Sequence, residues 1–233
     1  MPQPHASDSA STGPASATNA LVSRIERRLR EGPFARATRY GLRRDLDVPF
    51  DPPEAKIPLT MRPLEQADMM ALFPAESTGR DAAEFGEAAS RLGLAEKAPD
   101  RGLVAVDPAT GSPCYVQWLL GPQDNDIVRR IGGFPELAPD EALLEGAYTP
   151  PAYRGLKIMP AAMAAFAERA RELGARYVIT FVDVGNVPSL KGCQRAGFYP
   201  DLLHRYLQVG FGTIRRNRFE KLPEDDPRRA AAF

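Results

Sequence analysis

The stretch LLEGAYTPPAYRGLKIMPAAMAAFAERARELGARYVITF, residues 143–181, decides the fold of this chain. Residues 143–149 carry apolar and aromatic side chains without a proline, which predicts a β-strand. Pro150 and Pro151 end this strand, because proline has no N–H group to donate to a neighbouring strand. A turn, a helix and a second strand are expected to follow in that order.

A helix is predicted over residues 159–173, where apolar side chains recur at helical spacing and share one face: Met159, Met163, Phe166, Ala167, Ala170 and Leu173. Gly174 follows, as is typical of a helix C-terminus. Residues 177–182 are an unbroken run of β-forming residues, which predicts a strand buried on both faces. The two strands and the helix form a βαβ unit. Its basic turn, residues 154–157, presents backbone N–H groups at the start of the helix, where an anion such as phosphate can bind.

Two groups of residues in this region fall in the order of a known family. Arg154, Gly155, Leu156, Lys157, Ile158 and Met159 follow the first strand, and Asn186, Ser189, Cys193, Gly197 and Phe198 follow the second. This pattern resembles the GNAT superfamily of acyl-CoA-dependent N-acyltransferases over residues 143–198, and more thinly over 57–142. The resemblance implies an α/β (α+β) fold: a central mixed, mostly antiparallel sheet with a splayed parallel strand pair, flanked by helices.

The resemblance also implies an activity. An acetyl or other acyl group would pass from acyl-CoA to a primary amine, which attacks the thioester directly. The acyl-CoA, used as co-substrate, would lie between strands 143–149 and 177–182. Its phosphates would be held by Arg154, Gly155, Leu156, Lys157, Ile158 and Met159. Its thioester oxygen would meet a backbone N–H near Tyr148 and Thr149. Asn186 would contact the pantetheine arm or cap the short helix that follows it.

Two residues are candidates for proton transfer. Alternation along the first strand puts Glu145 on the face of Leu143 and Ala147, where a partly apolar cleft can raise the pKa of a carboxylate and make it a base. The alternative for Glu145 is a surface carboxylate paired with an arginine. Cys193 stands where many members of the family carry the tyrosine that protonates the thiolate. The alternatives are that Cys193 is a small buried packing residue and that Tyr199 or Tyr206 supplies the acid.

The basic turn departs from the family pattern. Lys157 and Met159 replace two small residues, and Pro160 removes one N–H donor. Lys157 could compensate by placing a charge on a phosphate. Three functions therefore remain open: an N-acyltransferase using acyl-CoA, a long-chain acyltransferase using acyl carrier protein as donor, and a non-catalytic GNAT-like binding module. A basic helix predicted over residues 20–31 would support the second, as a surface for anionic lipid or an acidic carrier protein, but its short length favours a docking helix with a solvated basic face.

The chain is expected to divide into four segments: a disordered tail at 1–19, the basic helix and a proline-containing arm at 20–56, the acyltransferase domain at 57–222 and a C-terminal tail at 223–233. Residues 39–46 are predicted as a strand or a loose arm. The remaining elements expected are strands near 60–64, 102–107, 115–120, 203–211 and 213–219, helices at 65–72 and 81–95, and a long irregular loop at 121–140. The helix at 81–95 should bury Phe85, Ala88, Ala89 and Leu92.

Composition limits the compartment and the partners. The 233 residues carry 30 basic and 30 acidic side chains, so no net field favours nucleic acid. No apolar run approaches the roughly 20 residues of a transmembrane helix, and no signal peptide pattern is present. Two cysteines offer neither a disulfide framework nor a metal cluster. We expect a cytoplasmic protein that meets an acyl donor and a small amine, and that is able to form a homodimer.

Overall fold

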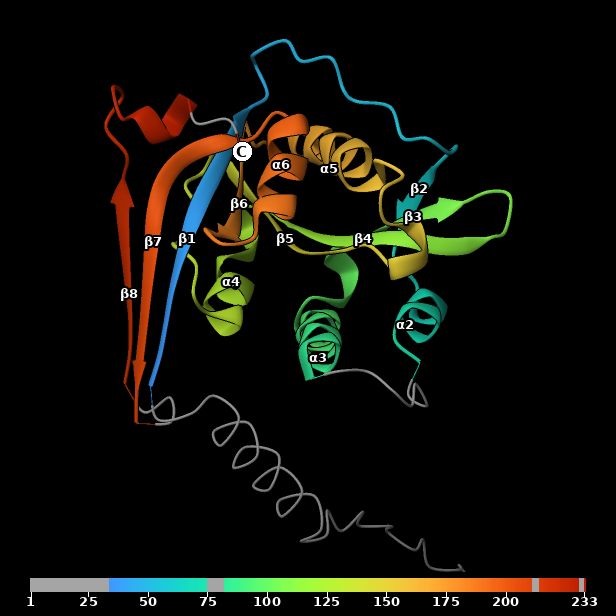
Figure 1. The fold of residues 1–233 in the computed structure, drawn as a ribbon, viewed down its shortest axis with the longest axis horizontal. Helices are drawn as coiled ribbons and strands as arrows, with labels where there is room; N and C mark the ends of the chain where they lie inside the picture. Colours follow the sequence, from blue (N-terminus) through green and yellow to red (C-terminus); the bar gives the residue numbers. More distant parts are fainter. Residues whose placement is uncertain (1–33, 75–81, 211–213, 231–232) are drawn as a thin grey trace, which may run out of the picture. The chain divides into compact units, whose positions relative to one another are not determined.

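The computed structural model describes residues 34–74, 82–210, 214–230 and 233 of the chain. Within these residues eight strands form one sheet in the order β2-β3-β4-β5-β6-β1-β7-β8 (Figure 1). The strands are β1 Phe34–Asp45, β2 Thr60–Pro63, β3 Gly102–Asp107, β4 Ser112–Leu120, β5 Glu141–Tyr148, β6 Tyr177–Asp183, β7 Tyr199–Val209 and β8 Ile214–Lys221. The sheet is mixed and mostly antiparallel, and its parallel pair is β5 with β6, which confirms the predicted fold class.

Helices cover both faces of the central strands. The α-helices are α2 Gln66–Leu72, α3 Ala82–Lys97, α4 Asn125–Ile131, α5 Ile158–Glu168 and α6 Val187–Arg195. Short 3-10 helices are η1 Pro99–Arg101, η2 Pro122–Asp124, η3 Pro151–Tyr153, η4 Arg169–Leu173 and η5 Pro227–Ala230. In Figure 1, α5 and α6 lie on one face of β4 and β5, and α2, α3 and α4 lie on the other. None of the described helices is long and apolar enough to cross a membrane.

The chain divides into two compact units. One consists of residues 1–37 and 206–217, and the other of residues 38–205 and 218–233. The larger unit contains the βαβ segment and every feature of the site described below. The predicted tail at 1–19 and the predicted basic helix at 20–31 lie outside the described residues.

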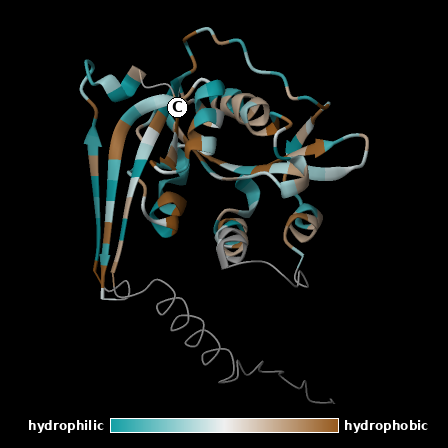
Figure 2. Ribbon diagram, viewed as in Figure 1, coloured by the Kyte–Doolittle hydropathy of each residue, from teal (hydrophilic) through white to brown (hydrophobic). Residues whose placement is uncertain are grey.

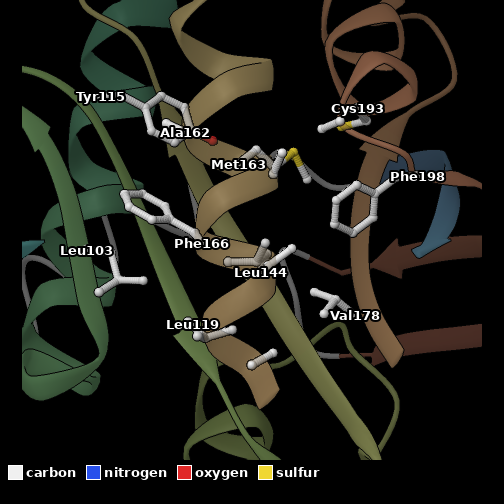
Figure 3. Packing of buried hydrophobic residues seen from close by; sticks show 14 of the residues in the cluster. Leu103, Tyr115, Leu119, Leu144, Ala162, Met163, Phe166, Val178, Cys193 and Phe198 are labelled. Carbon is white, nitrogen blue, oxygen red and sulfur yellow. The ribbon is translucent and has the colours of Figure 1, made fainter. Parts of the chain in front are cut away.

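Each layer of helices packs on its own hydrophobic core. On the α5 face the core includes Tyr115, Leu144, Met163, Phe166 and Phe198, which interlock in Figure 3. On the α3 face it includes Trp118, Leu120, Val128, Leu143 and Phe181. Figure 2 shows hydrophobic residues along the strands between the two layers. Neighbouring residues of β5 enter opposite cores, because successive side chains of a strand point to opposite faces.

The decisive stretch folds as predicted. β5, α5 and β6 match the strand, helix and strand expected there, and Gly174 ends the helical segment with φ 80°. The last turn, η4, is 3-10 rather than α-helical. Residues 39–46, which were predicted as a strand or an arm, belong to β1: Arg39 to Asp45 pair antiparallel with Asp183 to Tyr177. These residues therefore pair within the same sheet as the strands that follow Ile57.

Two expectations on the α3 face are wrong. The predicted loop at 121–140 contains η2 and α4, and Val128 of α4 is buried in the core. α3 was expected to bury Ala89 and Leu92, but Ala89 is exposed and Leu92 is 47% exposed. Ala88 and Leu94 face the core instead. The helix is thus rotated relative to the prediction. Leu94 faces the core because it packs against Gly146 of β5, which has no side chain.

Candidate active site

The parallel strands β5 and β6 separate soon after they start. They pair at three positions, where Glu141, Ala142 and Leu143 face Tyr177, Val178 and Ile179. Beyond Leu143 no β5–β6 pair occurs among these described strands. The half of β5 that follows Leu143 therefore lines a gap in the sheet, in line with the splay that the family resemblance implies.

A β-bulge lies in β5 at this gap. Trp118 of β4 pairs with Glu145 and Val116 pairs with Tyr148, so two residues of β5, Gly146 and Ala147, oppose a single residue of β4. Gly146 has φ 73°, and a Cβ there would overlap Leu94 and stand 3.0 Å from Trp118 Cε3. Only glycine satisfies both the backbone and the packing at this position.

The bulge corrects the predicted alternation of β5. Ala147 was expected on the face of Leu143 and Glu145, but it packs against the core on the α5 face, and Tyr148 packs against the core on the α3 face. The extra residue reverses the alternation after Gly146, because the side-chain period of a strand is two. Tyr148 thereby reaches Phe73 of α2, with ring centroids 4.9 Å apart.

The basic loop, residues 154–159, joins this strand to α5. Gly155 has φ 80° and Lys157 has φ 57°, so the chain turns left-handed twice before the helix begins. Lys157 is the N-cap of α5, whose first backbone N–H groups have no partner within the helix. The segment before the loop is fixed to the β3–β4 turn, since the Tyr153 hydroxyl lies 3.2 Å from Thr110 Oγ1 and 3.4 Å from Asp107 Oδ2.

The basic loop borders a cavity of about 530 Å³, here called the basic cavity. Eight of the predicted cofactor-binding residues line it: Tyr148, Thr149, Arg154, Gly155, Lys157, Ile158, Met159 and Asn186. The ninth, Leu156, packs against the core instead. Asn186 also caps α6, because its side-chain oxygen accepts a hydrogen bond from the backbone N–H of Ser189 at 3.2 Å.

Charge in the basic cavity is one-sided. Arg154, Lys157 and Arg195 line it, and no carboxylate is among its described lining residues. The whole chain has equal numbers of acidic and basic side chains. Three cations around one cavity, next to the N-terminus of α5, therefore favour an anionic ligand. Sequence reasoning missed Arg195, which comes from the last turn of α6 and belongs to no local motif.

Glu145 lies on β5 just beyond its last pair with β6 and opposite Trp118 of β4. Its side chain is half-buried, and this burial raises the pKa of the carboxyl group. The charges of Arg39 and Arg91 and a backbone hydrogen bond at Gly146 act in the opposite direction. Sequence reasoning also missed Arg91 of α3, whose Nη2 donates a hydrogen bond to the Ala147 carbonyl at 2.8 Å. A partly buried carboxyl group with a raised pKa suits a general base.

Cys193 lies on the buried face of α6, near Met163 and Phe198 in Figure 3. It is 1% exposed, it is not among the residues that line the basic cavity, and burial raises the pKa of its thiol to about 12. The thiol therefore stays protonated at neutral pH.

His204 is the histidine within the described residues that could have served Cys193 as a base. Its ring stacks on Phe219 with centroids 4.4 Å apart and meets the Phe181 ring edge-on. It thus packs with the core on the opposite face from Cys193.

Tyrosines offer other hydroxyl groups. Tyr115 lines the basic cavity although it is otherwise buried, and its hydroxyl donates to Gln117 Oε1 at 2.7 Å. Burial raises the pKa of Tyr115 well above its usual value. Of the two tyrosines considered from the sequence, Tyr199 is 50% exposed and Tyr206 donates to Gln208. Neither of these two lines the basic cavity.

A second cavity, here called the apolar cavity, lies between α2 and α3 and measures about 700 Å³. Its lining is mainly hydrophobic and includes Met69, Phe73 and Leu92, with Glu65 and Gln66 as polar members. Phe73 contributes to this cavity and its ring packs at a tilt of 43° against Tyr148, which lines the basic cavity. One pair of aromatic rings therefore stands between the two cavities.

Residues 84–198, which contain the bulge, the basic loop and α6, match the family model described as the Acetyltransferase (GNAT) family. This chain contains a GNAT acetyltransferase domain. The GNAT domain accounts for both of the motif groups found in the sequence. No curated protein sequence matches the chain.

Solved structures of GNAT proteins resemble the chain. A GCN5-related N-acetyltransferase from Sphaerobacter thermophilus is 21% identical, with coverage of 91% of this chain and 59% of that one and a TM-score of 0.45. A GNAT-family acetyltransferase from Colwellia psychrerythraea is 13% identical, with coverage of 87% and 74% and a TM-score of 0.47. One from Brucella melitensis, in complex with acetyl-CoA, is 18% identical, with coverage of 57% and 81% and a TM-score of 0.37. The chain spans about three fifths of the length of the first structures it matches.

Proposed function

We propose that this protein is an N-acyltransferase that moves an acetyl or other acyl group from acyl-CoA to a primary amine. The observation that carries the proposal is the basic cavity. It lies beside the splayed strands, and the three cations among its described lining residues suit the phosphates of CoA. A donor bound there would extend its acyl group along β5 toward the bulge.

The proposed reaction assigns roles to Glu145 and to the backbone of the β5 bulge. The amine nitrogen attacks the thioester carbon, the new C–N bond forms and the C–S bond breaks. The proton lost by the amine passes to the Glu145 carboxylate, which releases it to solvent, and the thiolate takes up a proton from solvent and leaves as CoA-SH. Backbone N–H groups of the bulge stabilise the charge that develops on the carbonyl oxygen. Cys193 has no part in this scheme, because a buried thiol with a pKa of about 12 is a weaker acid than the departing thiol.

We place the amine on the α3 side of the sheet. The apolar cavity opens there, and the Phe73–Tyr148 ring pair connects its wall to that of the basic cavity. Donor and acceptor would then reach the gap from opposite faces, so neither has to leave before the other binds. A primary amine that carries a hydrophobic group would suit this lining better than a highly charged amine.

Calorimetric titration tests the proposal directly. We expect acetyl-CoA to bind the wild type with micromolar affinity and to bind Arg154→Gln and Lys157→Gln more weakly. Arg130→Gln is the matched control, because Arg130 is an exposed arginine of α4 that does not line the basic cavity. A long-chain acyl-CoA, titrated in parallel, reports the preferred acyl length.

Two results would contradict the proposal. Binding of holo-acyl carrier protein without binding of any acyl-CoA would favour the carrier-dependent alternative. If no donor binds, the GNAT domain is a non-catalytic module, and the strained Lys157 backbone becomes a sign of a degraded loop. If acyl-CoA binds and Glu145→Gln keeps full turnover, the proposed base is wrong while the proposed donor stands.

A further inference from the structure

α3 holds the bulge of β5 with two side chains that lie one helical turn apart. Leu94 fills the space beside Gly146 that a Cβ would need. Arg91 reaches a backbone group 56 positions away in the sequence, since its Nη2 donates to the carbonyl oxygen of Ala147 at 2.8 Å. Its guanidinium also lies 5.9 Å from the centre of the Tyr148 ring. A single helix therefore sets both the shape of the bulge and the direction of the Ala147–Tyr148 peptide group.

The hydrogen bond from Arg91 acts on a rigid unit. The carbonyl of Ala147 and the N–H of Tyr148 belong to one planar peptide group, so a donor that fixes the oxygen also fixes the direction of the N–H. The donor is a cation, and such hydrogen bonds are roughly twice as strong as those between neutral groups. Hydrogen bonds in series polarise one another at low local dielectric. The positive charge on the oxygen side therefore makes the N–H side a better donor.

This peptide lies where the reacting carbonyl would lie. Ala147 and Tyr148 both line the basic cavity, at the place where β5 has left β6. We propose that Arg91 is a positioning residue, which orients and polarises the Ala147–Tyr148 peptide so that the backbone donors of the bulge bind the acyl oxygen of the donor. The inference rests on the proposed function, because it needs an acyl-CoA in the basic cavity.

An arginine suits this task better than a lysine. Its planar guanidinium carries several donors in a fixed arrangement, so it can hold a carbonyl at a set angle while part of its surface packs against a ring. A lysine would keep the charge but lose the fixed direction. We therefore expect Arg91→Lys to retain part of the effect and Arg91→Gln to lose most of it.

Infrared difference spectroscopy of bound acetyl-CoA, labelled with ¹³C at the thioester carbonyl, reports this effect without an acceptor amine. In the wild type the thioester stretch should move to lower frequency than in water, because strong donors lengthen the C=O bond. Arg91→Gln should reverse most of that shift and Arg91→Lys about half. The dissociation constant of acetyl-CoA should change less than about threefold. With an amine that is turned over, kcat should fall about 10- to 100-fold in Arg91→Gln, with KM little changed.

Lys97→Gln is the matched control, because Lys97 is an exposed cation of the same helix. It should keep the wild-type frequency and kcat. A wild-type frequency in Arg91→Gln, or a loss of affinity equal to the loss of kcat/KM, would overturn the inference and leave the proposed function intact. Failure of the wild type to bind acetyl-CoA would instead overturn the proposed function, and the inference with it. If Arg91→Gln does not fold, Arg91→Lys decides, and a frequency equal to that of the wild type counts against the inference.

Discussion

The two ends of the gap in the sheet are built in different ways. The basic loop is contiguous in sequence, carries its cations at the surface and gets its shape from two left-handed residues. The bulge is partly buried, and its shape depends on α3, which lies some 50 positions earlier in the chain. An anion site can be made by neighbouring residues alone, whereas a reacting centre draws its precision from elements far apart in the sequence. Changes in the loop should therefore affect binding, and changes at the bulge should affect turnover and stability.

Glu145→Gln is expected to have the largest effect and to separate the two regions most clearly. Turnover of an amine should fall about 10²- to 10⁴-fold, as when a general base is removed, while calorimetry should give a nearly unchanged dissociation constant for acetyl-CoA. Glu136→Gln, which changes an exposed carboxylate, is the control. Equal losses of turnover and donor affinity would show that Glu145 contributes to binding of acetyl-CoA rather than to proton transfer.

The pH dependence of the same variant adds a second test. Burial raises the pKa of Glu145 above its ordinary value, so the folded state binds a proton that the unfolded state has already lost. Stability should therefore decrease as pH rises from the unfolded pKa through the folded pKa. Turnover should rise over the same interval as the base ionises. In Glu145→Gln both changes should disappear, as measured by urea unfolding and by rate profiles. If the pH dependence of stability or of turnover persists in Glu145→Gln, that dependence belongs to another titratable group.

Gly146→Ala should come next, with a loss of about 2–4 kcal/mol of unfolding free energy, because a left-handed backbone and an overlap with Leu94 both oppose a Cβ. Gly111→Ala is a matched control: Gly111 has a similar φ of 70° but open space around it. It should lose about 1–2 kcal/mol. Leu94→Ala should recover part of the difference in the Gly146→Ala background. If the two glycine variants are equally stable, α3 does not press on the bulge.

Arg154→Gln should weaken acetyl-CoA binding about tenfold, a cost of about 1.4 kcal/mol, and Lys157→Gln should act similarly. Both losses should shrink at high salt, since exposed charges are screened. The melting temperature should hardly change. Lys157→Gly separates charge from backbone: it relieves the left-handed strain but removes the cation. Tighter binding of acetyl-CoA by Lys157→Gly would mean that the loop binds by backbone alone.

Cys193→Ser should have the smallest effect. Placing a hydroxyl in the apolar site beneath α6 should cost about 1 kcal/mol of stability, and kcat and KM should stay within about twofold of the wild type. A larger loss of kcat without a loss of stability would restore the thiol as a proton donor and would extend the reacting centre to the α6 face.

Residues that act through local patterns were predictable. The basic loop, α5 and the buried strand β6 all follow from periodicity, glycine and proline within a few positions of one another. Contacts made by residues from distant parts of the chain were not predictable. Nothing near Arg91 marks it as a partner of Ala147, and the bulge at Gly146 appears in the sequence only as a glycine inside a strand. The same limit applies to Arg195 and to β1, whose place depends on pairing with residues more than 130 positions away.

That position of β1 has a consequence for synthesis. Residues 39–45 leave the ribosome early, but their partners on β6, residues 177–183, follow only after most of the chain has been made. Until then the first strand has an open edge that can pair with the wrong segment. Contacts so distant along the chain slow folding, and exposed strand edges promote aggregation. A pulse-labelled nascent chain should therefore protect β1 from protease only once β6 has emerged, and its other edge stays open until β7 follows.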